Sequence, residues 1–167
     1  MDVKQVIQSQ YYAALEMLKQ AILRCPDSLW DAAEDQNKFW QVAYHALFYA
    51  HLYLQESIAD FKPWMKHKEG AERPGTAPEK INMAYTRAEI LEYLAVCQAQ
   101  VAEQTASLNV DAPSGFEWLP FNKLELQLYN IRHVQQHVGE LYERLGARAK
   151  IELDWVSQTP DYLSEKK

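Results

Sequence analysis

Two histidines of the 167-residue chain, His133 and His137, lie four positions apart in the segment NIRHVQQHVGEL. On a helix, side chains four apart project from one face, so both imidazoles can bind a single divalent ion. A third histidine, His45, lies in a separate apolar segment, and metal sites in helical bundles are built from facing helices. Three neutral imidazoles leave a fourth coordination position open, as in catalytic rather than structural sites. This pattern predicts a three-histidine metal site.

Each histidine also has a purely structural interpretation. His133 and His137 would then form hydrogen bonds across a bundle, and His45 would be a core histidine satisfied by a carbonyl or a tyrosine hydroxyl. The sequence leaves both interpretations open. His51 follows His45 by six positions, about 240° around a helix, so it is predicted to be structural. Nothing in the sequence places His67.

Three other side chains could take part in chemistry. Glu140 follows His137 by three positions, where it would either orient that imidazole or be a solvated surface charge; the surface interpretation is favoured. Cys25 and Cys97 form no CxxC motif, and each falls on an apolar stripe. They are therefore predicted to be buried, unreactive thiols.

The segment that contains His45 is apolar on every side of a helical wheel. Residues 39–55 read FWQVAYHALFYAHLYLQ, with no acidic residue, lysine or arginine. Such a helix is buried all round, in a protein core or in a membrane. A membrane span needs about 20 strongly apolar residues, whereas this segment contains three Tyr, two His and two Gln. We therefore predict the central helix of a bundle, at about 38–58.

Apolar residues at spacings of three and four predict three further helices, at about 3–24, 87–108 and 123–145. The core stripe of the last one is predicted to contain Leu124, Leu128, Ile131, Val134, Val138, Leu141 and Leu145. Four amphipathic helices in one chain of this length predict a single all-α domain over residues 1–167, folded as a four-helix bundle.

Local signals set the predicted helix boundaries. Pro26 ends the first helix, and Asn37 is the predicted cap of the second. Thr86 and Asn122, each with a Glu three positions later, read as capping boxes of the third and fourth helices. Gly146 is the predicted end signal of the fourth.

Long loops rich in Pro and Gly are predicted between the second and third helices and between the third and fourth. The first of them, about 60–85, is either a lid over a site or a plain linker. Past residue 150 the tail, 150–167, contains several apolar residues, and part of it is expected to pack back on the bundle.

The net charge of −6 argues against a nucleic-acid partner and against an amphipathic anchor on anionic lipid. The first residues, MDVKQVIQSQ, lack the basic and apolar regions of a secretory signal. No membrane association and a cytoplasmic location are therefore expected.

The two histidine segments together resemble the DinB/YfiT-like superfamily of bacterial helical bundles. The resemblance lies in one histidine in the middle of the second helix, in FWQVAYHALFYAHL, and in a fourth-helix motif close to His-x-x-x-His-x-Gly-Glu/Gln-Leu. The matching positions are His45, His133, His137, Gly139, Glu140 and Leu141.

This resemblance implies a divalent metal, zinc or nickel, bound by His45, His133 and His137. It also implies a homodimer that acts on a small-molecule substrate, either as a hydrolase or as a transferase that uses a low-molecular-weight thiol. The alternative is a non-catalytic bundle that binds a small ligand or dimerises, in which the histidines are structural.

Overall fold

Five helices make up the regular structure of the described residues, which contain no strand. The computed structural model describes residues 2–75 and 84–160. The helices are α1 (Val3–Arg24), the single-turn α2 (Asp27–Trp30), α3 (Phe39–Leu54), α4 (Arg87–Ser107) and α5 (Lys123–Ala149). The predicted all-α class and four long helices are confirmed.

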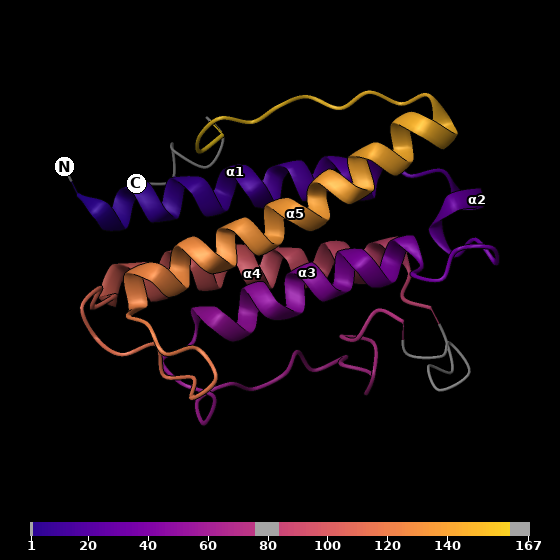
Figure 1. Cartoon of the computed structure of the whole chain (residues 1–167). Helices are drawn as coiled ribbons and strands as arrows, with labels where there is room; N and C mark the ends of the chain where they lie inside the picture. Colours follow the sequence, from indigo (N-terminus) through magenta and orange to yellow (C-terminus); the bar gives the residue numbers. More distant parts are fainter. Residues whose placement is uncertain (1, 76–83, 161–167) are drawn as a thin grey trace.

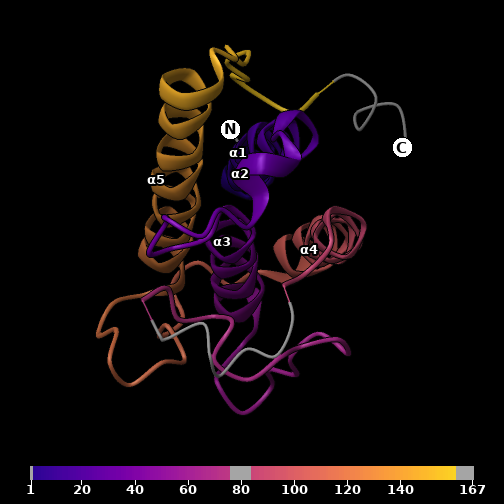
Figure 2. The ribbon, with the colours of Figure 1, turned by 90° about the vertical axis from the view of Figure 1, so that its right-hand side faces the viewer.

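The four long helices form a bundle with one crossover connection (Figures 1 and 2). Helix α1 runs antiparallel to α4, since Lys4 Nζ donates to the carbonyl of Ala106 while Arg87 Nε donates to that of Ile22. Helices α3 and α4 are parallel neighbours. The described part of their connection, residues 55–75, accordingly runs back along the bundle (Figure 1). Around the bundle the order is α1, α4, α3, α5.

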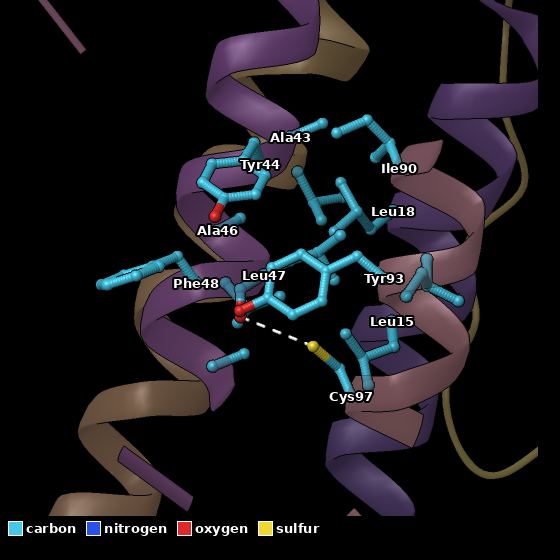
Figure 3. Packing of buried hydrophobic residues seen from close by; sticks show 14 of the residues in the cluster. Leu15, Leu18, Ala43, Tyr44, Ala46, Leu47, Phe48, Ile90, Tyr93 and Cys97 are labelled. Atoms are coloured by element: carbon cyan, nitrogen blue, oxygen red, sulfur yellow. Dashed lines mark hydrogen bonds between the residues drawn. The ribbon is translucent and has the colours of Figure 1, made fainter. Parts of the chain in front are cut away.

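Helix α3 is the most buried of the four, as its apolar sequence predicts. All of its side chains are buried except His45 and Tyr49. Figure 3 shows its contact with α4 and α1, where the packed side chains include Leu15, Leu18, Ala43, Leu47, Ile90, Tyr93 and Cys97. The thiol of Cys97 donates to the carbonyl of Leu47 at 3.5 Å. Both cysteines are free and buried, as expected.

The ends of α3 differ from the prediction. Its N-terminal cap is Lys38 rather than Asn37, without a side-chain hydrogen bond. Its last residue is Leu54, earlier than predicted, and Lys123 of α5 binds the free carbonyls that follow. The buried Lys123 ammonium donates to the carbonyls of Gln55 at 3.0 Å and Glu56 at 2.5 Å. A cation at a helix C-terminus also interacts favourably with the helix dipole.

Three predictions for α5 need correction. Its first turn forms half of the capping box, in which Asn122 accepts from the Glu125 backbone N–H. The helix continues past Gly146 to Ala149, where Lys150 adopts a left-handed conformation (φ 58°) and ends it. Leu128, placed in the core stripe by its spacing, is 58% exposed. Leu128 lies on the solvent-facing side of α5, whereas Leu126, Gln127 and Asn130 in the same turns are buried against the bundle.

The tail and the long loop both pack on the bundle where they are described. Residues 150–160 run back along α1 (Figure 1), with Gln10 donating to the Ser157 carbonyl at 3.2 Å and the Thr159 N–H donating to Ser9 at 3.0 Å. In the loop, Trp64 is buried. The rest of the predicted lid, 76–83, and of the predicted tail, 161–167, lie outside the described residues.

None of the helices in residues 2–75 and 84–160 has the length and hydropathy needed to cross a membrane.

Candidate metal centre

His45 lies on the one strip of α3 that the core does not cover. It and Tyr49 are one helical turn apart and are the two α3 side chains that are only partly buried. This strip faces α5. A residue that is polar on a buried helix needs a partner, so the neighbours of His45 decide what it can do.

The register between α3 and α5 is fixed by buried polar side chains of α5 that bind carbonyls of α3. Asn130 donates to the Ala50 carbonyl at 3.1 Å, and Gln127 donates to the Tyr53 carbonyl at 3.3 Å. Because these helices are antiparallel, residues later in α5 lie opposite residues earlier in α3. His133 is thereby placed against His45.

The three predicted ligands meet at one point. His133 Nε2 lies 3.1 Å from His45 Nε2 and 3.1 Å from His137 Nε2. One nitrogen of each ring lies within 4.8 Å of the other two. Two nitrogens bound tetrahedrally to zinc at 2.0–2.1 Å are about 3.3 Å apart. The spacing of the imidazoles therefore fits a divalent ion with a small adjustment.

The hydrogen bonds of Nδ1 in His45 and His137 show which way the lone pair of each ring points. His45 Nδ1 lies 2.6 Å from the carbonyl oxygen of Glu72. A carbonyl only accepts, so Nδ1 carries the proton and the lone pair on Nε2 points toward the other imidazoles. His137 Nδ1 lies 3.2 Å from the Glu140 carboxylate and is protonated in the same way.

Burial keeps the rings of His45 and His133 neutral. Burial lowers the pKa of His45 to about 4, against the opposing effect of the Glu72 carbonyl. Burial, followed by the nearby His137 and His45, lowers the pKa of His133 to about 3. An imidazole must be neutral to bind a metal, so at neutral pH both rings are ready to act as ligands.

The acceptors on Nδ1 of His45 and His137 leave the lone pairs of their Nε2 atoms pointing toward the centre, where a cation would be a suitable partner. The Nδ1 atom of His133 is buried and has no hydrogen-bond partner among the described residues. The structure thus fits a metal at Nε2 of all three rings, held in orientation by acceptors on two of them.

Glu140 orients His137, which corrects the prediction that it is a solvated charge. Its other oxygen lies 3.3 Å from Arg144, whose guanidinium also donates to the carbonyl of Asn37 at 2.8 Å. The hydrogen bond from His137, above all, lowers the pKa of the Glu140 carboxyl. Through Arg144, Glu140 therefore links His137 to Asn37 in the loop that precedes α3.

The remaining histidines do not join the centre. His51 Nδ1 lies 3.2 Å from the Tyr93 hydroxyl in the core, which fits the structural role predicted for it. His67 Nδ1 lies 2.6 Å from the Tyr44 hydroxyl.

Sequence reasoning missed Glu72 and Tyr49. Beyond its carbonyl bond to His45, Glu72 has a buried side-chain atom, Oε2, with no hydrogen-bond partner among the described residues. The Tyr49 ring packs 4.8 Å from His45 and 5.5 Å from His133. Tyr49 could have been found from its position one turn after His45. Glu72 had no such signal, since it comes from an aperiodic loop.

Comparisons with known proteins give one match. No curated protein and no solved structure matches the chain. The family model described as the DinB superfamily matches residues 10–141, which include all three histidines of the centre.

Proposed function

Because this chain belongs to the DinB superfamily, we propose that it is a metal-dependent enzyme whose ion is bound by His45, His133 and His137. The observation that carries the proposal is the convergence of three imidazole nitrogens within 4.8 Å. Protonated Nδ1 atoms on two of the rings add support, because they leave Nε2 free to bind. Zinc or nickel is the proposed ion, since both bind imidazole readily.

The centre is suited to catalysis rather than to structure alone. A divalent ion held by His45, His133 and His137 would supply Lewis acidity toward a bound substrate or nucleophile. Among the protein's own groups, Glu72 Oε2, which has no hydrogen-bond partner among the described residues and lies 4.0 Å from His67 Nε2, would accept a hydrogen bond from a substrate hydroxyl, thiol or water. The Tyr49 ring would cover one side of the site and exclude solvent.

The proposed reaction is hydrolysis of a small molecule, or transfer of a group to a low-molecular-weight thiol. A water and a thiol are both nucleophiles that a Lewis acid activates. Assays of the zinc- and nickel-loaded protein with 4-nitrophenyl esters, and with cysteine plus 1-chloro-2,4-dinitrobenzene, separate the two reactions. We also propose a homodimer. Sedimentation should then give a mass of twice the 19.4 kDa of one chain.

Calorimetric titration of untagged, metal-free protein with zinc and nickel tests the centre. One ion should bind per chain, and His133→Ala should weaken binding at least 10- to 100-fold, the scale seen for changes to groups that merely orient ligands. His51→Ala is the control: it removes a buried histidine outside the centre, so it should lower stability and leave metal affinity unchanged. Absence of binding by the wild type, or full binding by His133→Ala, would refute the site and the enzyme with it.

A further inference from the structure

A groove of about 530 Å³ lies on the outer side of the first half of α5. Its lining includes Phe121, Leu124, Glu125, Leu128, Tyr129 and Arg132, and we call it the Arg132 groove. Its volume falls within the range of sites for small organic molecules, about 300–1,000 Å³. The metal centre does not account for it, because none of the three histidines lines it.

Apolar and polar side chains share the lining about equally, and one large apolar side chain in it is open to solvent. Leu128 is 58% exposed, although it is a large aliphatic side chain in the middle of a helix. The rings of Phe121 and Tyr129 lie 5.9 Å apart beside it. An apolar molecule of suitable size would remove this surface from water, which is favourable.

Arg132, the cationic side chain that lines the groove, forms no ion pair with a carboxylate in the part of the chain that the structure describes. The Arg132 guanidinium lies 5.8 Å from the centre of the Tyr129 ring. Glu125 is the acid of the groove, but seven residues of helix separate it from Arg132, about 10 Å along the axis. Arg132 is thus available to a carboxylate or sulfonate, which a guanidinium binds with two parallel hydrogen bonds.

Aromatic rings join the groove to the metal centre. Tyr129 lies one helical turn before His133, and its ring is 5.7 Å from that of Tyr53. The Tyr53 ring is 5.7 Å from Tyr49, which packs 5.5 Å from His133. Tyr129 therefore lines the groove on one side and contacts the aromatic wall of the centre on the other.

We propose that the Arg132 groove binds an organic anion with an apolar body, whose acid group pairs with Arg132. Its use as a substrate site for acid-bearing molecules rests on the proposed function, whereas the binding of an anion does not. The other occupant of an exposed apolar face would be a second copy of the chain, but charge complementarity favours a small anion.

A matched pair of fluorescent probes tests the groove in the full chain. 8-Anilinonaphthalene-1-sulfonate carries an acid group, and N-phenyl-1-naphthylamine is nearly the same molecule without it. Wild type should bind the sulfonate more tightly than the neutral amine. Arg132→Gln should weaken sulfonate binding about tenfold, through loss of the charge-assisted hydrogen bonds, and should leave amine binding unchanged. Leu128→Ser should weaken the binding of both.

The control is Arg24→Gln, which removes an exposed arginine at the C-terminal end of α1, the opposite end of the bundle. It should change neither affinity. Sulfonate binding by Arg132→Gln equal to that of wild type would overturn the proposal. So would a sulfonate affinity that rises on dilution into monomers, because two copies would then cover the groove.

The metal centre and the groove can fail separately. His133→Ala should bind the sulfonate like wild type, whatever happens to zinc. If zinc fails to bind while the probes respond to Arg132→Gln, the proposed function falls and the groove stands. If the centre binds zinc and Arg132→Gln binds both probes like wild type, the groove alone is refuted.

Discussion

At the scale of single residues, the proton on Nδ1 decides which way the lone pair on Nε2 points in two of the proposed ligands, His45 and His137. For His45 the acceptor is the backbone carbonyl of Glu72, which no side-chain substitution removes. For His137 the acceptor is the carboxylate of Glu140. The contribution of orientation to metal affinity can therefore be measured at Glu140.

Glu140→Ala should weaken zinc binding by about 10- to 100-fold, because His137 loses the group that fixes its proton and its ring. Glu140→Gln keeps an acceptor oxygen and loses the charge, so its loss should be smaller. Glu143→Ala, an exposed acid on the next turn of α5, is the control and should bind zinc like wild type. Calorimetric titration measures all three, and an affinity of Glu140→Ala equal to the control would show that Glu140 has no orienting role.

At the scale of elements, the C-terminus of α5 contains the one non-glycine residue with a positive φ in the described part of the chain, Lys150 at φ 58°. A side chain with a Cβ is strained in this conformation, whereas glycine adopts it readily. The strain is local and independent of the metal centre.

Lys150→Gly should therefore raise the free energy of unfolding, by about 0.5–1 kcal/mol. Ala147→Gly, three residues earlier at an exposed position inside the helix, should lower it by about 1 kcal/mol. Urea unfolding of both variants beside wild type gives the two signs. A Lys150→Gly protein less stable than wild type would show that the Lys150 side chain contributes more through its hydrogen bond to the Ala147 carbonyl than the strain costs.

At the scale of the whole molecule, the buried imidazoles link folding to pH. The pKa values of His45 and His133 fall to about 4 and about 3 in the folded protein, against about 6.5 in an unfolded chain. The unfolded state therefore binds more protons, and stability rises with pH. The contribution of the neutral imidazoles to the free energy of unfolding is complete above about pH 6.5. It is lost as the pH falls from there toward the folded pKa values.

The free energy of unfolding of the metal-free protein, held in chelator, should accordingly decrease between pH 7 and pH 5. His133→Asn removes one of the three histidines whose pKa burial lowers, His45, His51 and His133, so its stability should change less over the same interval. Model carboxyl groups, with pKa values of about 3.9–4.3, titrate mostly below this window, in which the imidazoles of an unfolded chain titrate. Urea unfolding at pH 5, 6 and 7 measures the slope, and identical slopes for wild type and His133→Asn would contradict the linkage.

The sequence determined the helices and two parts of the centre. Residues 39–55 are apolar on every side, so they had to form the buried helix, and a spacing of four had to place His133 and His137 on one face. These features are local, because they depend only on the periodicity of the backbone. The boundaries were less certain: α5 continues past Gly146, since Lys150 provides the left-handed residue that ends it.

Only the tertiary structure brought His45 to the pair on α5. Buried amides of Asn130 and Gln127 set the register between the two helices, and side-chain periodicity contains no information on register. The crossover of the 55–75 connection placed the Glu72 carbonyl on His45, and the packing of α5 against the segment before α3 brought Arg144 to the Asn37 carbonyl. Such contacts join residues far apart in the chain or on neighbouring elements, so their geometry depends on packing and not on local sequence.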